Sequence, residues 1–326
     1  MAKENKEFNS IKQAKIVFQY FHKHSKEDTL KAFNLKESSL DRYLRAARIA
    51  GEVPTGKSSI LNKIAENYTD TELLAIANGG RLVPGIAPVP IIDFDGQHIK
   101  IGFITDTHMG HMKYSENRLF QAFEEFRKEK VDFVVHVGDI VEGMNNRHEG
   151  QIYELTHLGY ERQKAYAVQQ LGQWTDTDIY AISGNHDRWF LKSNGANIVG
   201  DLEKELDNFH FIGHDEGDIS LKGKATLKLW HGEDGSSYAL SYRIQKLVES
   251  LSGGEKPAAL FCGHTHKYVK IFERNVWCVS GGSIEAQTSW MRSKKLAAHV
   301  GFVVVDLWVN DKGICKMSDT WYPFYT

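Results

Sequence analysis

Apolar side chains recur at helical spacing through the first fifty residues of the chain. The first stripe, at intervals of three or four, consists of Ile11, Ala14, Val17, Phe18 and Phe21. Ser25 is a typical N-cap residue for a short second helix. The segment Asn34-Leu35-Lys36 predicts a turn, after which we expect a third helix.

The third helix is expected to be amphipathic and basic. Ser38 and Asp41 resemble a capping box at its start. Its apolar face is formed by Leu40, Tyr43, Leu44 and Ala47, and a second face carries Arg42, Arg45 and Arg48. Two short helices around a tight turn resemble a helix-turn-helix unit that contacts DNA or RNA. A three-helix bundle used in dimerisation or packing is the alternative.

From residue 89 onward the pattern changes to short apolar runs. These runs predict strands at residues 99–105, 133–137, 179–183, 226–230, 258–262, 276–280 and 301–309. Amphipathic stretches between them predict helices near residues 116–129, 160–173, 197–206 and 238–251. The segment before residue 105 also predicts two strands joined by a hairpin turn at Asp95-Gly96. Strands that alternate with helices indicate an α/β layered domain.

These patterns divide the chain into a basic helical domain at residues 1–60, a linker at 61–90 and an α/β domain at 91–326. The linker begins with a helical pattern and continues into a stretch that contains several prolines. Residues 51–58 match the G-x-x-x-x-G-K-S pattern of a phosphate-binding loop. Such a loop follows a buried strand, whereas a helix precedes this segment, so we interpret it as a turn or wing.

Composition indicates the class of protein. Hydrophobic residues make up 41% and charged residues 25%, which is typical of a globular protein with a sizeable core. The apolar runs are too short to cross a bilayer, and the N-terminus lacks the apolar core of a signal peptide. Cys262, Cys278 and Cys315 show no paired spacing, so we expect buried free thiols in a cytoplasmic protein without a membrane partner.

The net charge of −2 conceals an uneven distribution. Residues 1–63 carry 13 Lys and Arg against 7 Asp and Glu, which leaves 27 against 35 for the rest of the chain. A basic N-terminal segment in an otherwise acidic chain favours an anionic partner for that segment. We expect this partner to be nucleic acid. A solvated basic face without a partner would show the same balance.

Polar clusters follow the ends of several predicted strands. They are Asp106-Thr107-His108, Gly138-Asp139, Gly184-Asn185-His186-Asp187, His231-Gly232 and Gly263-His264-Thr265-His266. Because open α/β sheets bind ligands at the carboxyl ends of their strands, we expect these side chains in one crevice. Carboxylate, imidazole and amide ligands together suit Mn, Fe, Zn or Ni, whereas an all-oxygen set suits Mg or Ca. The sequence thus predicts a pair of divalent metal ions, with Asp139 as the bridging carboxylate.

In type and order these motifs resemble those of the calcineurin-like metallophosphoesterases. The family motifs are D-x-H, G-D-x-x-(D/E), G-N-H-(D/E), an isolated His and G-H-x-H. Their counterparts here are DTH (106–108), GDIVE (138–142), GNHD (184–187), HG (231–232) and GHTH (263–266). The resemblance covers about residues 97–310. It implies an α/β two-sheet sandwich flanked by helices, to which this chain adds a small all-α N-terminal domain.

The resemblance also implies how the ligands are divided between the ions. The ligands of one ion would be Asp106, His108 and His266, and those of the other Asn185, His231 and His264. Asp139 would bridge the two. His186 would supply a proton or stabilise the transition state without binding metal, and Asp187 would orient its imidazole. We expect two Mn²⁺ ions, with Fe, Zn, Ni or Mg as alternatives.

Within the family, the segments DTHMG, GDIVEG and GNHDRW are most similar to nucleases of double-strand-break repair. We expect the chain to differ from them in lacking a capping domain after the core and in carrying a basic helical unit before it. The expected function is a metal-dependent phosphodiesterase, a nuclease that cleaves DNA by in-line attack of metal-activated hydroxide. The residues expected to contact nucleic acid are Arg42, Arg45, Arg48, Arg147, His148 and Arg188.

Other functions fit the same motifs. They are a phosphodiesterase of small molecules or cyclic nucleotides, a protein phosphatase, and a DNA-binding regulatory protein. The presence of His186 beside an intact ligand set favours an enzyme over a binding protein. The choice between DNA and RNA and the oligomeric state stay open at this level.

Overall fold

The chain divides into an N-terminal unit, residues 1–82, and a larger unit, residues 83–326. The computed structural model describes residues 2–49, 89–145, 150–233, 239–252 and 256–325. The turn or wing predicted at residues 51–58 lies outside the described residues, as does nearly all of the predicted linker. The domain limits given above therefore stay predictions.

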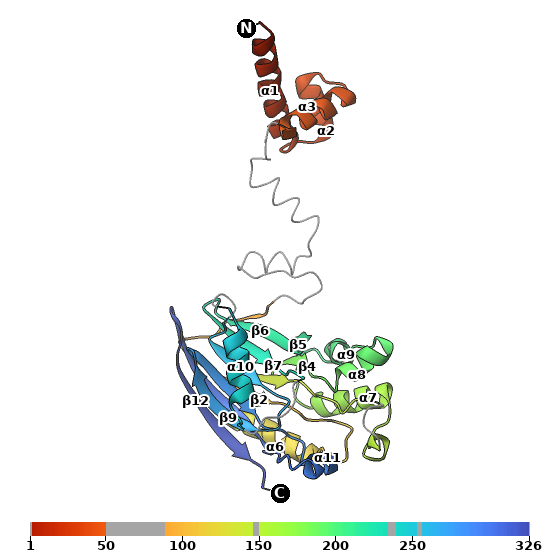
Figure 1. Ribbon diagram of the computed structural model, residues 1–326, viewed down its shortest axis with the longest axis vertical. Coiled ribbons are helices and arrows are strands. Elements are labelled where there is room, and N and C mark those ends of the chain that lie inside the picture. Colours follow the sequence, from red (N-terminus) through yellow and green to blue (C-terminus); the bar gives the residue numbers. More distant parts are fainter. Residues whose placement is uncertain (1, 50–88, 146–149, 234–238, 253–255, 326) are drawn as a thin grey trace. The chain divides into compact units, whose positions relative to one another are not determined.

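Helices α1 (Ala2–Phe21), α2 (Lys26–Phe33) and α3 (Glu37–Ile49) form the described part of the N-terminal unit (Figure 1). The buried side chains that they share are Ala14, Val17, Phe18, Leu40, Leu44 and Ala47. These residues belong to the apolar stripes predicted for the first and third helices, which are confirmed wherever side chains are described. Burial of these stripes against each other is what stabilises such short helices.

The predicted ends of the short helices are confirmed in part. The Ser25 hydroxyl accepts a hydrogen bond from the Asp28 N–H (3.1 Å), and Asn34 ends α2 in the left-handed conformation. The capping box predicted at Ser38 is wrong. Because the carbonyl of Lys36 already accepts the N–H of Leu40, α3 begins at Glu37 and Ser38 lies inside its first turn.

The larger unit contains two six-stranded sheets. The first sheet, in spatial order, consists of β12 (Gly313–Pro323), β11 (Gly301–Asn310), β2 (His98–Ile104), β3 (Phe133–Val137), β4 (Ile179–Ser183) and β5 (Phe209–His214). The second consists of β1 (Ile91–Ile92), β6 (Glu216–Leu221), β7 (Ala225–Trp230), β8 (Ala259–Cys262), β10 (Val276–Gly281) and β9 (Tyr268–Glu273). The helices are α6 (Glu116–Glu129), the 3₁₀ turn η1 (Gln151–Tyr153), α7 (Tyr160–Leu171), α8 (Arg188–Asn194), α9 (Ile198–Glu205), α10 (Tyr242–Ser250) and α11 (Ser289–Ser293).

The two sheets pack face to face with helices outside them (Figure 1). Their shared core includes Phe103 and Phe261, whose rings stack at 4.9 Å between centroids. Helices α6, α7 and α9 cover the outer face of the first sheet, and α10 packs on the second. The expected α/β sandwich flanked by helices is therefore confirmed.

Parallel pairing brings the carboxyl ends of neighbouring strands to the same end of each sheet. Strands β2 to β5 are parallel to one another, and so are β7, β8 and β10. Two parallel strands that follow each other in the chain must be joined by a crossover connection, usually a helix. Helices α6, α7 and α10 lie in the connections that follow β2, β3 and β7. As a result, the residues that follow β2, β3 and β4 lie together at the carboxyl end of the first sheet. The residues that follow β7 and β8 lie together at the carboxyl end of the parallel strands of the second.

The hairpin predicted at Asp95-Gly96 is wrong. Strand β1 pairs in parallel with β6 of the second sheet, through Ile91 and Ser220, whereas β2 belongs to the first sheet. Both edges of β2 are occupied, by β3 and β11, so β1 has no place beside it. The segment around Gly96 therefore connects the two sheets.

None of the helices in the described ranges is long and apolar enough to span a bilayer. Cys262 and Cys278 are buried free thiols, as expected. Cys315 is exposed, which corrects the expectation of a buried thiol, because it lies on the edge strand β12.

Candidate metal centre

The predicted strand-end clusters meet at one rim of the sandwich. In chain order they contribute Asp106 and His108 after β2, Asp139 after β3, Asn185 and His186 after β4, His231 after β7, and His264 and His266 after β8. Most of these side chains line a single cavity of about 360 Å³. The structure thus brings together every residue that the sequence proposed as a metal ligand.

Unusual backbone geometry turns these side chains inward. The left-handed conformation, with φ between 51° and 71°, is adopted by Asp106, His108, Asp139, His264 and His266. It costs a non-glycine residue roughly 1–2 kcal/mol. Hydrogen bonds between adjacent strand ends hold it, such as Asp106 N–H to the Gly138 carbonyl (3.1 Å) and His108 N–H to the Asp139 carbonyl (3.0 Å). Strain that the surrounding frame enforces is typical of functional sites.

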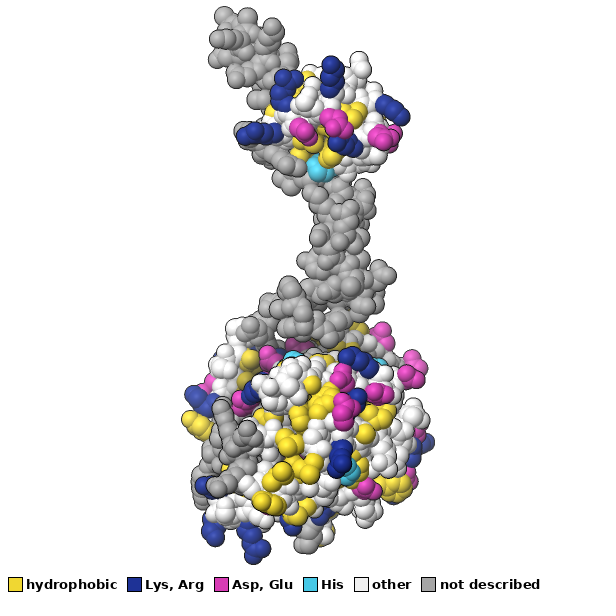
Figure 2. Space-filling view, turned by 90° about the vertical axis from the view of Figure 1, so that its right-hand side faces the viewer, with side chains coloured by type: hydrophobic (Ala, Val, Ile, Leu, Met, Phe, Trp, Pro, Cys, Tyr) yellow, Lys and Arg dark blue, Asp and Glu magenta, His cyan; other side chains and the backbone are white. Residues whose placement is uncertain are grey.

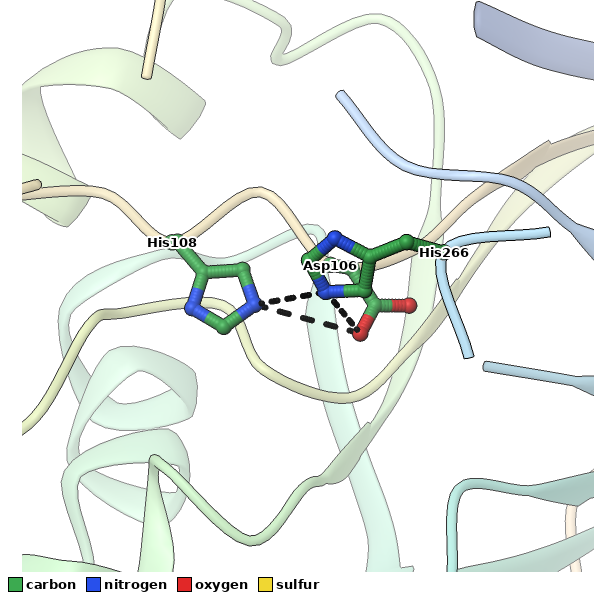
Figure 3. A group of neighbouring side chains, drawn as sticks. All are labelled: Asp106, His108 and His266. Atoms are coloured by element: carbon green, nitrogen blue, oxygen red, sulfur yellow. Dashed lines mark hydrogen bonds and ion pairs between the residues drawn. The ribbon is translucent and has the colours of Figure 1, made fainter. Parts of the chain in front are cut away.

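Asp106, His108 and His266 form the first cluster, with their polar atoms pointing toward one another (Figure 3). Oδ1 of Asp106 lies 3.2 Å from Nε2 of His266 and 3.9 Å from Nε2 of His108. The two Nε2 atoms are 3.2 Å apart. Two imidazole nitrogens and a carboxylate oxygen at these spacings are a donor set typical of a transition-metal site.

The second cluster contains Asn185, His231 and His264. The amide oxygen of Asn185 lies 2.8 Å from Nδ1 of His264 and 3.2 Å from Nε2 of His231. The other ring nitrogen of His231 donates to the Val137 carbonyl (2.7 Å), which leaves Nε2 as the nitrogen that faces the site. This arrangement is that of a metal-ligating histidine fixed by a backbone carbonyl.

Asp139 lies between the two clusters. Its Oδ2 is 3.0 Å from Nε2 of His231 and 3.8 Å from Nε2 of His108. Its Oδ1 accepts the backbone N–H of His186 (2.8 Å), which fixes the orientation of the carboxylate. One carboxylate oxygen therefore lies within 4 Å of a nitrogen from each cluster, the position that a bridging ligand would need.

The electrostatics of the site favour a positive charge. Burial opposes ionisation of Asp106, but the imidazoles of His266 and His108 outweigh it and hold the pKa of this carboxyl well below its usual range. Burial also opposes protonation of His231, yet the Asp139 carboxylate raises its pKa to about 9. The carboxylates thus stay charged and His231 keeps a proton, whereas burial and the charge of His231 lower the pKa of His264 to about 4. Divalent cations fit the same field and the same donor atoms, so the residues present match a two-metal site.

His186 is held by Glu142 rather than by Asp187. Nδ1 of His186 donates to the Glu142 carbonyl (2.8 Å) and lies 3.3 Å from its carboxylate, which also contacts Nδ1 of His108 (2.8 Å). The Asp187 carboxylate instead accepts the backbone N–H groups of Ile140, Val141 and Gly184. The predicted orienting contact of Asp187 is therefore replaced by one from Glu142, and Asp187 ties the loops after β3 and β4 together.

Sequence reasoning missed further buried polar residues at this site. Glu142 is the last residue of the GDIVE motif, so its motif position was a usable signal. Glu285 and His111 are also buried and line the same cavity. Glu285 follows β10 in a segment with no recognised motif, and no pattern in the sequence marked it.

The residues predicted to contact nucleic acid are only partly described. Arg42 and Arg45 are exposed on α3. The described part of the structure does not include the side chain of Arg48, nor Arg147 and His148. Lys and Arg side chains project from the described helices of the N-terminal unit (Figure 2). Arg188 is ion-paired with Asp215 (2.6 Å) and Glu233, so its charge is compensated within the protein.

Gly184 is the position at which an added methyl group would disturb the site most directly. A Cβ there would lie 2.2 Å from Oδ1 of Asp139 and 2.7 Å from Nε2 of His231. We therefore expect Gly184→Ala to lower the free energy of unfolding by about 1–3 kcal/mol and to weaken metal binding. Thermal unfolding and calorimetric metal titration test this. Wild-type stability together with wild-type metal binding would contradict it.

Comparisons with known proteins agree with this geometry. The model of the calcineurin-like phosphoesterase superfamily domain matches residues 99–306. The small subunit of DNA polymerase II from Archaeoglobus fulgidus is 25% identical, in a match that covers 81% of this chain. The match covers 64% of that relative, so the chain spans less than two thirds of its length.

Solved structures similar to this chain include phosphoesterases and a sorting protein. A novel archaeal phosphodiesterase shares 16% identity, with a TM-score of 0.42, over 69% of this chain and 100% of the other. The phosphoesterase Yfce from E. coli shares 19% identity, with a TM-score of 0.38, over 68% and 98%. Vacuolar Protein Sorting 29 from Cryptosporidium parvum shares 15%, with a TM-score of 0.37, over 70% and 100%. Because the superfamily domain spans more than half of the residues, this chain belongs to the calcineurin-like phosphoesterase superfamily.

Proposed function

We propose that this protein is a two-metal phosphodiesterase that cleaves nucleic acid, with DNA as the favoured substrate. The observation that carries the proposal is the pair of donor clusters beside one cavity, with Asp139 between them. Asp106, His108 and His266 would hold one ion, and Asn185, His231 and His264 the other. The mixed oxygen and nitrogen donors suit Mn²⁺, the ion we expect in both positions, with Fe, Zn, Ni or Mg as alternatives.

A bound pair of divalent ions supplies a hydroxide nucleophile at neutral pH and neutralises charge on the phosphoryl oxygens. The chain's own residues orient that chemistry. Glu142 fixes the imidazole of His108 through Nδ1, which directs Nε2 toward the cluster. Asp139 is held by the backbone N–H of His186, so the bridging carboxylate and the next catalytic residue are placed together.

His186 is proposed to hold the proton that the leaving oxygen needs. A carbonyl can only accept, so Nδ1 of His186 carries a hydrogen toward Glu142 and Nε2 is the nitrogen available to a substrate. Burial opposes the charged imidazolium, but the Glu142 and Asp139 carboxylates outweigh it and raise the pKa of His186 above its ordinary value. A proton is thus kept at the cavity wall. Asp187, predicted to be catalytic, is proposed instead to brace the loop that carries His186.

The nucleic-acid substrate is supported by the basic N-terminal unit and by the type of relative found. The exposed Arg42 and Arg45 lie on α3, the second helix of the helix-turn-helix-like pair. The relative from Archaeoglobus fulgidus is a subunit of a DNA polymerase. The likeness of the motifs to repair nucleases points the same way. We propose residues 1–60 as the domain that holds the substrate and residues 91–326 as the domain that cleaves it.

A small phosphodiester is the second candidate substrate. The cavity of about 360 Å³ is near the lower end of the size range of ligand pockets, roughly 300–1,000 Å³. Its wall includes Glu142, Glu154 and Glu285, which would repel a long polyanion that lacks another anchor. This observation favours a compact substrate if the N-terminal unit has no role.

Incubation of the Mn²⁺-loaded chain with labelled single- and double-stranded DNA, RNA and a chromogenic phosphodiester tests the proposal. We expect cleavage of DNA. Removal of residues 1–60 is expected to weaken DNA binding and to leave hydrolysis of the chromogenic substrate almost unchanged. If Arg42 and Arg45 each bind a phosphate, Arg42→Gln or Arg45→Gln should lower the log–log salt slope by about 0.9 on duplex DNA.

Lys12→Gln is the matched control, because it removes an exposed positive charge from α1 instead of α3. It should leave the salt slope near that of the unaltered chain. If the truncated chain binds DNA as well as the full chain does, with the same salt dependence, the N-terminal unit serves in packing or dimerisation. The small phosphodiester would then be the better candidate.

A further inference from the structure

Glu285 is a buried carboxylate on the cavity wall to which the proposed mechanism assigns no role. Its loop, between β10 and α11, is tied to the strand end that carries Asp106. The N–H of Glu285 donates to the Asp106 carbonyl (3.2 Å), and the hydroxyl of Ser283 donates to the same carbonyl (2.9 Å). The position of Glu285 is thus fixed relative to a proposed metal ligand.

The side chain of Glu285 points toward the first donor cluster. It is 1% exposed, and its Oε2 lies 4.0 Å from Nε2 of His108. That nitrogen is the one that faces Asp106 and His266, since Nδ1 of His108 is engaged by Glu142. The oxygen therefore lies beside the imidazole nitrogen that His108 contributes to the first cluster.

His111 is the nearest cationic partner of this buried charge. Oε1 of Glu285 lies 2.5 Å from Nδ1 of His111, and although burial opposes protonation of His111, the Glu285 carboxylate outweighs it and raises the pKa of this imidazole. The nearby guanidinium of Arg118 donates to the carbonyls of Lys113 and Ile284. The ion pair with His111 engages Oε1, and the other oxygen, Oε2, is the one directed at His108.

We propose that Glu285 is an additional carboxylate ligand of the ion held by Asp106, His108 and His266. The proposal rests on the two-metal function above and assigns this ion a further oxygen donor. His111 contacts the far oxygen, Oε1, and thereby fixes the direction of the near one, Oε2. Because carboxylate oxygen suits Mn²⁺ and Mg²⁺ better than softer metals, Glu285 biases this position toward Mn²⁺.

Calorimetric titration of the metal-free full chain with Mn²⁺ tests the role of Glu285. The unaltered chain should bind two ions, and Glu285→Gln should weaken one of them by on the order of 10–100-fold, as loss of a residue that supports a metal site does. Glu285→Asp keeps the charge on a shorter side chain and should fall between the two. When one equivalent of Mn²⁺ is added to Glu285→Gln, the ion should bind at the other site, formed by Asn185, His231 and His264. Electron paramagnetic resonance measures this occupancy.

Glu154→Gln is the matched control. It removes the same charge from the same cavity, but Glu154 contacts the opposite ring nitrogen of His111, at 3.4 Å, and both Mn²⁺ affinities should stay unchanged. Thermal unfolding of the metal-free variants adds a second readout. Glu285→Gln removes the charge that pairs with His111, so the metal-free variant should be no more stable than the unaltered chain, and added Mn²⁺ should raise its unfolding temperature by less.

Two results would overturn the inference. If Glu285→Gln binds two Mn²⁺ with unaltered affinity but unfolds at a lower temperature, Glu285 serves only as the ion-pair partner of His111, and the two-metal site itself stands. If the unaltered chain binds fewer than two Mn²⁺, the proposed function fails and the assignment of Glu285 fails with it.

Discussion

Asp139→Asn is expected to remove most of the phosphodiesterase activity and to lower the number of bound ions. The carboxylate of Asp139 is placed between the two donor sets, 3.0 Å from His231 and 3.8 Å from His108. An amide keeps the shape and loses the charge that screens two cations from each other. A unit charge at 4 Å is worth about 4 kcal/mol in an effective dielectric constant of about 20, which is about a thousandfold in affinity.

Activity against a chromogenic phosphodiester and the metal content after dialysis are the measurements for this variant. Asp207→Asn is a suitable control, because it removes an exposed carboxylate of the same unit. It should leave both quantities unchanged. Turnover of Asp139→Asn near that of the unaltered chain would rule out a bridging role and, with it, the division of the ligands between two ions.

The sequence was informative at this site because chemistry and backbone direction coincide there. A carboxylate or an imidazole directly after an apolar strand has little reason to be buried unless it binds something, and each predicted ligand follows such a strand. The order of the motifs added the pairing of ligands that single strand ends could not supply. Residues 99–105 and 133–137 were found as strands for a related reason, since parallel strands buried on both faces have continuous apolar sequences.

Prediction failed where partners come from distant parts of the chain. The segment before β2 contains a good turn sequence at Asp95-Gly96, yet β11, about two hundred residues later, occupies the edge of β2 that a hairpin would need. Strands β5, β6, β9 and β12 were missed because polar residues interrupt their apolar runs, as expected for strands at or near sheet edges. Local sequence does not encode which edge is free.

The same limit applies to the contacts around the ligands. Asp187 is adjacent to His186 in sequence, and adjacency suggested that it orients the imidazole. In the structure Glu142 makes that contact, 44 residues away, while Asp187 accepts backbone N–H groups. Glu285 is more remote still and has no motif. Supporting residues are selected by three-dimensional proximity, so they are the part of a site that one sequence predicts least well.

His186→Ala is expected to keep both ions and to lose on the order of 10²–10⁴ in kcat, the usual contribution of a positioned acid or base. His186 lines the cavity, but its Nδ1 is engaged by the Glu142 carbonyl, and its backbone N–H, which holds Asp139, survives the substitution. Removal of the imidazole therefore takes away a proton source without removing a proposed metal ligand. Metal analysis and single-turnover kinetics with the same protein sample measure the two effects separately.

His264→Ala is the comparison that gives this result its meaning. His264 contacts the Asn185 amide oxygen at 2.8 Å within the second donor set, so its loss should empty or weaken one metal position as well as reduce activity. The two variants remove the same imidazole from the same cavity and differ only in the proposed role. Should His186→Ala release an ion while His264→Ala retains both, the roles of these histidines are exchanged, and the proton for the leaving oxygen must come from another group.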